Sequence, residues 1–303
     1  MMRAALLGAA ANPSMARFVS AHGRRLGAYR FVAGETLDEF MRAVAAVNAK
    51  GMRVAAGLLG EDVRDPDGAR AVAANYCEML DRFAADGAIA NVALKLTHLG
   101  IAIDRDQVKR NLSTVLAKAR EHRNFVRIDM EQSSYVQATL DLYRELRAEG
   151  IDNVGVVLQS YLYRSLPDLE ALAPLRPSIR IVKGAYLEPA SVAYPHKRDV
   201  DRNYVTLMEA SLAGGGFTAI ATHDERIIEH AIGFIKQHGI DSARFEFQML
   251  YGVRPGLQHR LADRGFGVRV AVPFGSQWYP YFMRRLAERP ANLLFFLSSV
   301  WRS

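Results

Sequence analysis

Residues 125–160 read FVRIDMEQSSYVQATLDLYRELRAEGIDNVGVVLQS, and this stretch decides the fold. It opens with an apolar run, continues with a segment whose apolar residues recur at helical spacing, and closes with a second apolar run rich in valine. Gly150 ends the helical segment, a position that glycine commonly takes. A strand, a helix and another strand in this order predict a βαβ unit with parallel strands.

The same alternation extends to both sides of this unit. Strands are predicted at 53–61, 91–100, 125–132, 153–160, 178–186, 217–224, 244–252 and 267–275, with amphipathic segments between them. Eight such units are the number that closes a (βα)₈ barrel of the TIM type, and the chain is therefore of the α/β class. An open doubly wound sheet would usually carry GxGxxG after its first strand, and this motif is absent. We predict a barrel domain at 51–303, with residues 1–50 as a helical segment that packs on it.

Composition narrows the classes of function. The chain has 303 residues, half of them hydrophobic and 23% charged, so it can bury a large core. The net charge of +7 suits an anionic ligand. Because the basic residues are scattered, we do not expect nucleic-acid binding. The single cysteine, Cys77, predicts a buried thiol in a reducing compartment, and no segment approaches the roughly 20 apolar residues of a membrane span. We expect a cytoplasmic protein.

The two ends of the chain leave alternatives open. The N-terminal MMRAALLGAAANPSMARFVS superficially resembles an export signal, but Asn12 and Pro13 interrupt its apolar run. We interpret it as a short packing helix. The apolar stretch Leu293–Trp301 could cover a cleft, pair with another subunit or touch a bilayer surface, and burial within the protein is the default interpretation.

Polar residues gather where the predicted strands end, which is where (βα)₈ barrels carry their functional groups. They are Glu61, Lys95, Asp129, Glu131, Gln159, Arg180, Lys183, Tyr186, Thr222, His223, Asp224 and Gln248. Each has an alternative explanation when taken singly. Lys95 could extend its amine out of an apolar surface, Asp129 could cap the next helix, and His223 could be a hydrogen-bonded core residue. Their coincidence at one rim favours a functional site.

Residues Trp278 to Asn292, WYPYFMRRLAERPAN, predict a helix that presents Arg284 and Arg285 beside aromatic surface. Tyr281 and Glu288 share a side of this helix with Arg285. A guanidinium group matches a carboxylate in bidentate fashion, so two of them could orient a small acidic substrate. The alternative is a solvated basic face with local ion pairs.

A catalytic metal is not expected. Barrels with His and Asp at strand ends often hold zinc or a pair of metals. Here His223 and Asp224 are adjacent, and neighbouring residues of an extended strand point to opposite faces. A His-x-His pair is also missing from the first predicted strand.

Six stretches together form a recognisable pattern: RIDMEQ, LQSYLYR, RIVKGAY, ATHD, EFQMLYGVR and WYPYFMRRLAERPAN. In this order and spacing the chain resembles the bacterial single-function proline dehydrogenase family from about Gly34 to Asn292. VKGAY and MRRLAERPAN are highly specific, whereas RIDMEQ alone is moderately so. The resemblance implies a distorted (βα)₈ barrel whose last helix lies over the barrel mouth. It also implies non-covalent FAD and the oxidation of L-proline to Δ1-pyrroline-5-carboxylate by hydride transfer to the flavin.

The resemblance further implies roles for individual residues. Arg284 and Arg285 match the pair that binds the proline carboxylate, Lys95 matches a lysine beside the substrate, and Asp129 matches an aspartate beneath flavin and substrate. Residues matching positions that line the proline pocket or close it are Glu61, Tyr186, Leu250, Ala271 and Tyr281. Residues expected at the flavin are Gln159, Arg180, Val182, Lys183, Gly184, Ala185, Thr222, His223, Gln248 and Glu288.

Ala271 departs from the family pattern, in which tyrosine usually stands at this position and shapes the pocket. Phe274 or Tyr279 could fill the space, or the wider pocket could admit 4-hydroxyproline or a related cyclic imino acid. The resemblance also suggests a quinone as electron acceptor, peripheral contact with the inner face of the membrane, a separate pyrroline-5-carboxylate dehydrogenase that consumes the product, and a homo-oligomer. A metal-dependent barrel hydrolase and a non-catalytic anion-binding barrel are the rivals from other classes.

Overall fold

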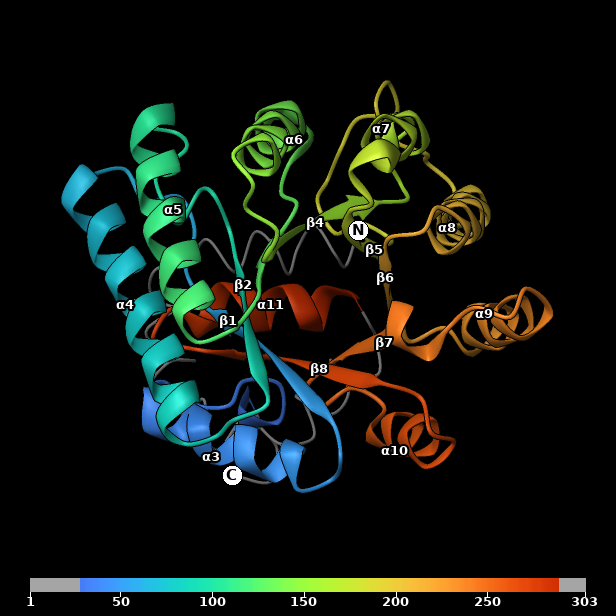
Figure 1. Cartoon of the computed structure of the whole chain (residues 1–303), viewed down its shortest axis with the longest axis horizontal. Coiled ribbons are helices and arrows are strands. Elements are labelled where there is room, and N and C mark those ends of the chain that lie inside the picture. The colour runs from blue at the N-terminus through green and yellow to red at the C-terminus, as the bar shows by residue number, and fades with distance from the viewer. Residues whose placement is uncertain (1–27, 289–303) are drawn as a thin grey trace.

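The chain folds as a closed ring of eight parallel strands surrounded by helices, which confirms the predicted (βα)₈ barrel (Figure 1). This computed structural model describes residues 28–288, and for residue 28 and residues 284–288 it describes the backbone alone. Each strand pairs with the next one along the chain. The ring closes because β8 pairs with β1, with Val270 opposite Val54.

The strands are β1 (Arg53–Leu58), β2 (Ala90–Leu94), β3 (Val126–Ile128), β4 (Val154–Gln159), β5 (Ser178–Val182), β6 (Phe217–Ala221), β7 (Phe245–Leu250) and β8 (Val268–Phe274). The α-helices are α3 (Leu37–Asn48), α4 (Pro66–Ala85), α5 (Arg105–Glu121), α6 (Ser133–Ala148), α7 (Ser165–Leu172), α8 (Lys197–Ala213), α9 (Glu225–Gln237), α10 (Pro255–Asp263) and α11 (Trp278–Glu288). Short 3₁₀ turns are η1 (Ala28–Arg30), η2 (Ala173–Leu175) and η3 (Ser242–Arg244).

Several helices begin at side chains that satisfy their first backbone N–H groups. Asp65, Asp104 and Asp224 accept hydrogen bonds from the first turns of α4, α5 and α9. At α3, Thr36 and Glu39 form a capping box, in which each side chain accepts from the backbone N–H of the other. These local signals fix where the helices start and therefore how the loops leave the strands.

The observed strands are shorter than the predicted ones. The run predicted at 91–100 ends its ladder at Leu94, and the run at 178–186 ends at Val182. Buried loop residues such as Leu96 and Leu99 extend the apolar pattern past the ladder, because the loops at this end are themselves covered. Most of the polar residues predicted at strand ends consequently lie in the first residues of the loops.

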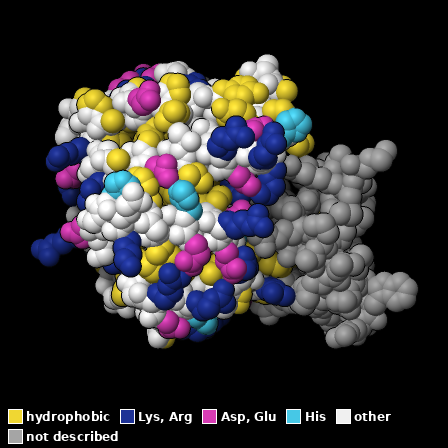
Figure 2. All heavy atoms as spheres, turned by 90° about the vertical axis from the view of Figure 1, so that its right-hand side faces the viewer, with side chains coloured by type: hydrophobic (Ala, Val, Ile, Leu, Met, Phe, Trp, Pro, Cys, Tyr) yellow, Lys and Arg dark blue, Asp and Glu magenta, His cyan; other side chains and the backbone are white. Residues whose placement is uncertain are grey.

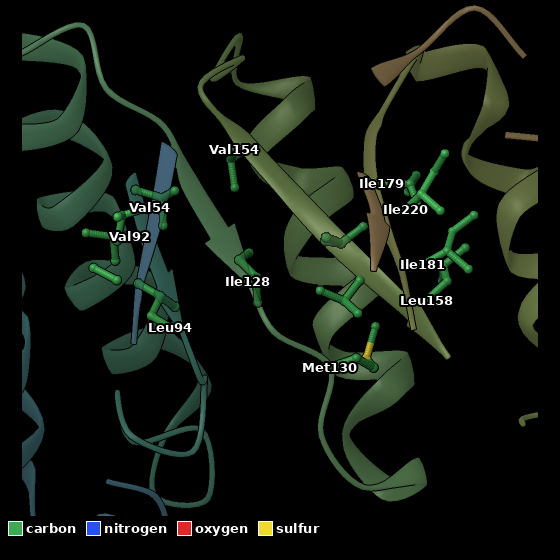
Figure 3. Packing of buried hydrophobic residues seen from close by; sticks show 14 of the residues in the cluster. Val54, Val92, Leu94, Ile128, Met130, Val154, Leu158, Ile179, Ile181 and Ile220 are labelled. Carbon is green, nitrogen blue, oxygen red and sulfur yellow. The ribbon is translucent and has the colours of Figure 1, made fainter. Parts of the chain in front are cut away.

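The two faces of the barrel wall differ in character. Outward-pointing residues such as Val54, Ile128 and Ile181 are fully buried against the surrounding helices (Figure 3). The alternate residues face the barrel interior, and among them are Arg127 and Glu246, which are also buried. An apolar outer layer therefore stabilises the wall, while the interior carries charge.

Helix α3 covers the outside of the barrel at β1 and β8. The ring of Phe40 stacks on the ring of Phe274 with 4.3 Å between centroids and lies 6.0 Å from the ring of Phe83 on α4. The part of the N-terminal segment that the structure describes thus contributes to the core. The predicted packing helix at residues 1–20 lies outside the described residues, as does Leu293–Trp301.

Helix α11 crosses the end of the barrel at which the strands finish (Figure 1). Its buried Trp278 and Phe282 form a cluster with Phe31, Val32 and Leu59, the residue that follows β1. The indole Nε1 of Trp278 also donates a hydrogen bond of 2.9 Å to Glu35. This cluster holds the start of α11 over the carboxyl ends of the strands.

The surface over α8, α9 and α10 carries interleaved acidic and basic side chains (Figure 2). Arg264, for example, donates to Glu229 at 2.7 Å. Among the helices of residues 28–288, none is both long and apolar enough to cross a bilayer. Cys77 on α4 is half-buried, not fully buried as predicted, since it lies at the edge of the core; burial raises the pKa of its thiol.

Candidate active site

The rim of the barrel is organised around the guanidinium group of Arg180. Its Nη1 donates to Asp129 Oδ1 at 2.6 Å, and its Nε donates to Gln248 Oε1 at 2.6 Å. The side chain of Arg180 is 9% exposed and that of Asp129 is 31% exposed, so this ion pair is largely shielded from solvent. Three strands, β3, β5 and β7, thereby bring together residues that are far apart in the sequence.

Arg180 Nη2, a donor, and Gln159 Oε1, an acceptor, are among the buried polar atoms that have no hydrogen-bond partner in the described part of the chain. Their strands are neighbours, since Val157 on β4 pairs with Arg180 on β5. Buried polar atoms in proteins are normally hydrogen-bonded, so a ligand with both an acceptor and a donor fits here. The pyrimidine edge of a flavin offers both.

The loop after β5 carries Lys183, Gly184, Ala185 and Tyr186. Gly184 has φ +105°, and a side chain there would collide with the ring of Tyr161, so the loop requires glycine. Lys183 Nζ donates to Asp224 Oδ2 at 3.0 Å and to Asp201 Oδ1 at 2.6 Å. The ammonium group predicted to contact a flavin is therefore held between two carboxylates.

The carboxylates around Lys183 are stabilised in their ionised form. Burial by itself would raise the pKa of Asp224, but the hydrogen bond and charge of Lys183 outweigh it and lower that pKa. The pKa of Asp201 is lowered for the same reasons, with Lys197 as a second cation. Lys183 and Lys197 together with Asp201 and Asp224 form a cluster of balanced charge at the ends of β5 and β6.

His223 and Asp224 serve separate partners. His223 Nε2 accepts a hydrogen bond of 2.9 Å from the backbone N–H of Leu250, which ties the end of β6 to the end of β7. Asp224 caps α9 through Arg226 N. Thr222 Oγ1 accepts from the backbone N–H of Asp224 at 3.1 Å. The side chains of His223 and Asp224 therefore have different structural partners.

On the opposite side of the rim, Glu131 is the buried carboxylate. It is 3% exposed and accepts hydrogen bonds from Thr97 N at 3.0 Å and Thr97 Oγ1 at 2.5 Å. Burial raises the pKa of Glu131, and the hydrogen bonds from Thr97 and the charge of Lys95 only partly offset it. Burial also lowers the pKa of His98 to about 4, and the charge of Lys95 adds to this effect. The positive charge of Lys95 thus affects the pKa values of two buried side chains, Glu131 and His98.

Ala271 lies in β8 between Leu250 of β7 and Ala55 of β1, as the strand register shows. These positions point into the barrel, so the small side chain leaves interior space. Phe274 does not fill it, because its ring faces outward and stacks on Phe40. Tyr279 is buried in the cluster under α11 with Trp278. The expectation that Phe274 compensates for Ala271 is therefore wrong.

For the other predicted site residues, the structure shows the element to which each belongs. Glu61 and Tyr186 follow β1 and β5, and Val182 ends β5, so all three are at the rim. Tyr281 is on α11 and packs against the cluster of Trp278. The backbones of Arg284, Arg285 and Glu288 belong to α11, but their side chains lie outside the described residues.

Sequence reasoning missed the charged residues inside the barrel. Glu246, Arg269 and Arg127 are buried or half-buried, and Glu246 Oε1 accepts hydrogen bonds from both Arg269 Nε and Gln248 Nε2, each at 2.6 Å. The signal was present, since each of these residues is a lone charge at an alternate position of an otherwise apolar strand. A charge on such a strand points to the interior of a barrel and needs a partner there.

Comparisons with known proteins show the family to which this chain belongs. The family model for proline dehydrogenase matches residues 40–297. Proline dehydrogenase of Deinococcus radiodurans is 45% identical over 277 residues, which cover 90% of this chain and 89% of that protein. Proline dehydrogenase 1 of Bacillus subtilis subsp. natto is 39% identical over 300 residues, 99% of each chain.

Among solved structures, proline utilization A from Bdellovibrio bacteriovorus has a TM-score of 0.82 and 26% identity. The match covers 86% of this chain and 32% of that protein, so this chain spans about a third of its length. This chain belongs to the proline dehydrogenase family.

Proposed function

We propose that this chain is an FAD-dependent enzyme that oxidises L-proline to Δ1-pyrroline-5-carboxylate. Family membership supports the substrate and the reaction. The observation that supports the cofactor is that an unpaired donor of Arg180 and an unpaired acceptor of Gln159 are buried on neighbouring strands, at the rim where a barrel enzyme binds its ligands.

FAD supplies the chemistry that side chains lack, because it accepts the hydride that leaves the ring carbon next to nitrogen. The residues proposed to hold it are those at the ends of β4 to β7: Gln159, Arg180, Val182, Lys183, Gly184, Ala185, Thr222, His223 and Gln248, together with Glu288 of α11. Arg180 is kept in one orientation by Asp129 and Gln248, so its free edge is preorganised. A fixed guanidinium there stabilises negative charge on a bound group.

The residues proposed to bind proline act by orientation. Arg284 and Arg285 on α11 bind the carboxylate, and Leu250, Tyr186 and Tyr281 hold the ring. Helix α11 covers the mouth and excludes water, which strengthens these charge interactions. Glu61 pairs with one of the arginines when the site is closed.

Lys95 contributes through its charge. A cation near the substrate amine disfavours the ammonium form, so the lone pair that assists hydride loss becomes available. The same charge lowers the pKa of His98 and opposes the rise in the pKa of Glu131. We propose Lys95, Asp129, Arg284 and Arg285 as the residues that act directly on catalysis.

The electrons leave for a second substrate, for which we propose a quinone at the inner face of a membrane. The basic surface charge is compatible with peripheral contact. A separate dehydrogenase then consumes the pyrroline-5-carboxylate, and a homo-oligomer is proposed as the assembly. Steady-state reduction of a soluble quinone analogue by proline tests the acceptor, and its complete failure would contradict it.

The visible spectrum of the purified protein tests the cofactor and the reaction together. We expect flavin absorbance that bleaches when L-proline is added without oxygen. A colourless protein with bound metal would indicate the barrel hydrolase, and a protein with neither colour nor turnover would indicate the anion-binding barrel. Arg285→Ala should lower kcat/KM for proline by a factor that corresponds to about 2–4 kcal/mol of lost transition-state binding. Arg264→Ala, a change on the surface, should leave kcat/KM unchanged.

A further inference from the structure

The barrel interior contains a continuous chain of hydrogen bonds that begins below the proposed active site. Arg269 Nε donates to Glu246 Oε1, Gln248 Nε2 donates to the same oxygen, and Arg180 Nε donates to Gln248 Oε1, each at 2.6 Å. Asp129 completes the chain at the rim through Arg180 Nη1. Glu246 is two residues before Gln248 on β7, so it lies one layer deeper in the barrel.

Glu246 determines which way the amide of Gln248 points. A carboxylate can only accept hydrogen bonds, so it requires the NH₂ group of Gln248 on its side. The amide oxygen must then face Arg180, which can only donate. With the opposite orientation, two acceptors would meet at Glu246 and two donors would meet at Arg180.

The hydrogen bonds that Glu246 accepts from Arg269 and Gln248 favour its ionised form. It is 1% exposed, and burial opposes its charge, but Arg269 and the hydrogen bonds to Arg269 and Gln248 outweigh burial and lower the pKa of Glu246. Glu246 is therefore an anion near neutral pH. It also offsets some of the positive charge that Arg127 and Arg269 add to the interior.

We propose that Glu246 is a positioning residue that acts through Gln248 to hold Arg180 with its unpaired Nη2 facing the flavin. This inference rests on the proposed function, because the partner of Nη2 is the proposed cofactor. Glu246 itself touches neither substrate nor flavin. Glu246 acts on Arg180 through the orientation of the Gln248 amide, which forms one hydrogen bond with each of them.

Two substitutions separate orientation from charge. Glu246→Gln removes the anion, so that of the two groups that fix the orientation of the Gln248 amide only Arg180 remains. Glu246→Asp keeps the anion but withdraws it by about one carbon–carbon bond, roughly 1.5 Å, so the contact with Gln248 is broken. We expect both variants to weaken FAD binding to the apoprotein by about ten-fold, the size of one lost hydrogen bond to a charged group. Both should also change the visible circular dichroism of the bound flavin.

Ser178→Ala is the matched control. Ser178 lies on β5 with Arg180, and its Oγ accepts a hydrogen bond of 2.8 Å from Arg127 Nη2. Ser178→Ala therefore also removes a hydrogen bond inside the barrel. It leaves the chain from Glu246 to Arg180 intact. FAD affinity should remain within about two-fold of wild type, while the melting temperature of the apoprotein reports any general loss of stability.

The decisive measurement is a double-mutant cycle with Gln248→Leu, which leaves no amide to orient. In that background Glu246→Asp should change FAD affinity by less than about two-fold. Additive effects would overturn the proposal, as would an effect of Glu246→Gln without one of Glu246→Asp, which would indicate interior charge alone. Wild-type FAD affinity in both Glu246 variants would overturn it and leave the proposed function standing. A wild-type chain that binds no flavin would overturn both.

Discussion

Substitution of Ala271 by tyrosine should convert an open substrate pocket into a narrow one. Ala271 points into the barrel between Ala55 and Leu250, and Phe274 faces away toward Phe40, so interior space is available for the new ring. If the ring covers about 40–60 Å² of apolar surface with a bound five-membered ring, it contributes about 1–1.5 kcal/mol at about 25 cal/mol per Å². This corresponds to roughly ten-fold in kcat/KM for L-proline.

The assay compares kcat/KM for L-proline and trans-4-hydroxy-L-proline in the wild type and in Ala271→Tyr. We expect the wild type to accept both compounds with values within about ten-fold of each other, because one added hydroxyl changes discrimination only modestly in an open pocket. Ala271→Tyr should gain activity on proline and lose it on the hydroxylated compound. Phe274→Leu, on the outer face of the same strand, is the control and should leave the ratio unchanged.

A strong preference of the wild type for proline would contradict the open pocket. An unchanged ratio in Ala271→Tyr would show that the space beside Ala271 is not part of the substrate site. Either result would leave the proposed proline oxidation intact and would remove only the argument about pocket size.

Three further predictions concern stability. Phe40→Ala should lower the free energy of unfolding by about 3–5 kcal/mol in denaturant titrations because it empties a fully buried site, whereas Leu37→Ala, half-buried on the same helix, should cost clearly less. Glu131→Leu should cost about 2–3 kcal/mol because it leaves the buried N–H of Thr97 without its acceptor, and a variant as stable as the wild type would refute this hydrogen-bond assignment. Burial lowers the pKa of His98 from 6.5 to about 4, so between these pH values the folded state binds fewer protons than the unfolded state. This difference contributes about 3 kcal/mol to the free energy of unfolding. The contribution is fully present above pH 6.5 and is lost as the pH falls toward 4. His98→Gln should flatten the pH dependence of unfolding between pH 4 and 6.5, and an unchanged slope would contradict the shift.

The rim could be predicted from the sequence because polar residues interrupt apolar runs at one end of each strand. Lys95, Asp129 and Arg180 were selected on that ground and lie at that end of the barrel. Their partners could not be predicted in the same way. Asp129 and Arg180 are 51 residues apart, and only closure of the barrel brings β3 and β5 within hydrogen-bond distance. The predicted boundary between residues 50 and 51 stays a prediction.

The sequence by itself determined the alternation of strands and helices, the count of eight, and the family, because apolar periodicity and long motifs are local properties of the chain. Only the tertiary structure determined which charged residues form hydrogen bonds inside the barrel and which side chains point away from the proposed pocket. Phe274 and Ala271 are three residues apart on one strand, and the alternation of side chains sends them to opposite faces of the wall. Glu246 was an isolated charge on an apolar strand until the closed ring placed Arg269 and Gln248 beside it. Such pairings depend on strand register around the whole barrel, which no local pattern specifies.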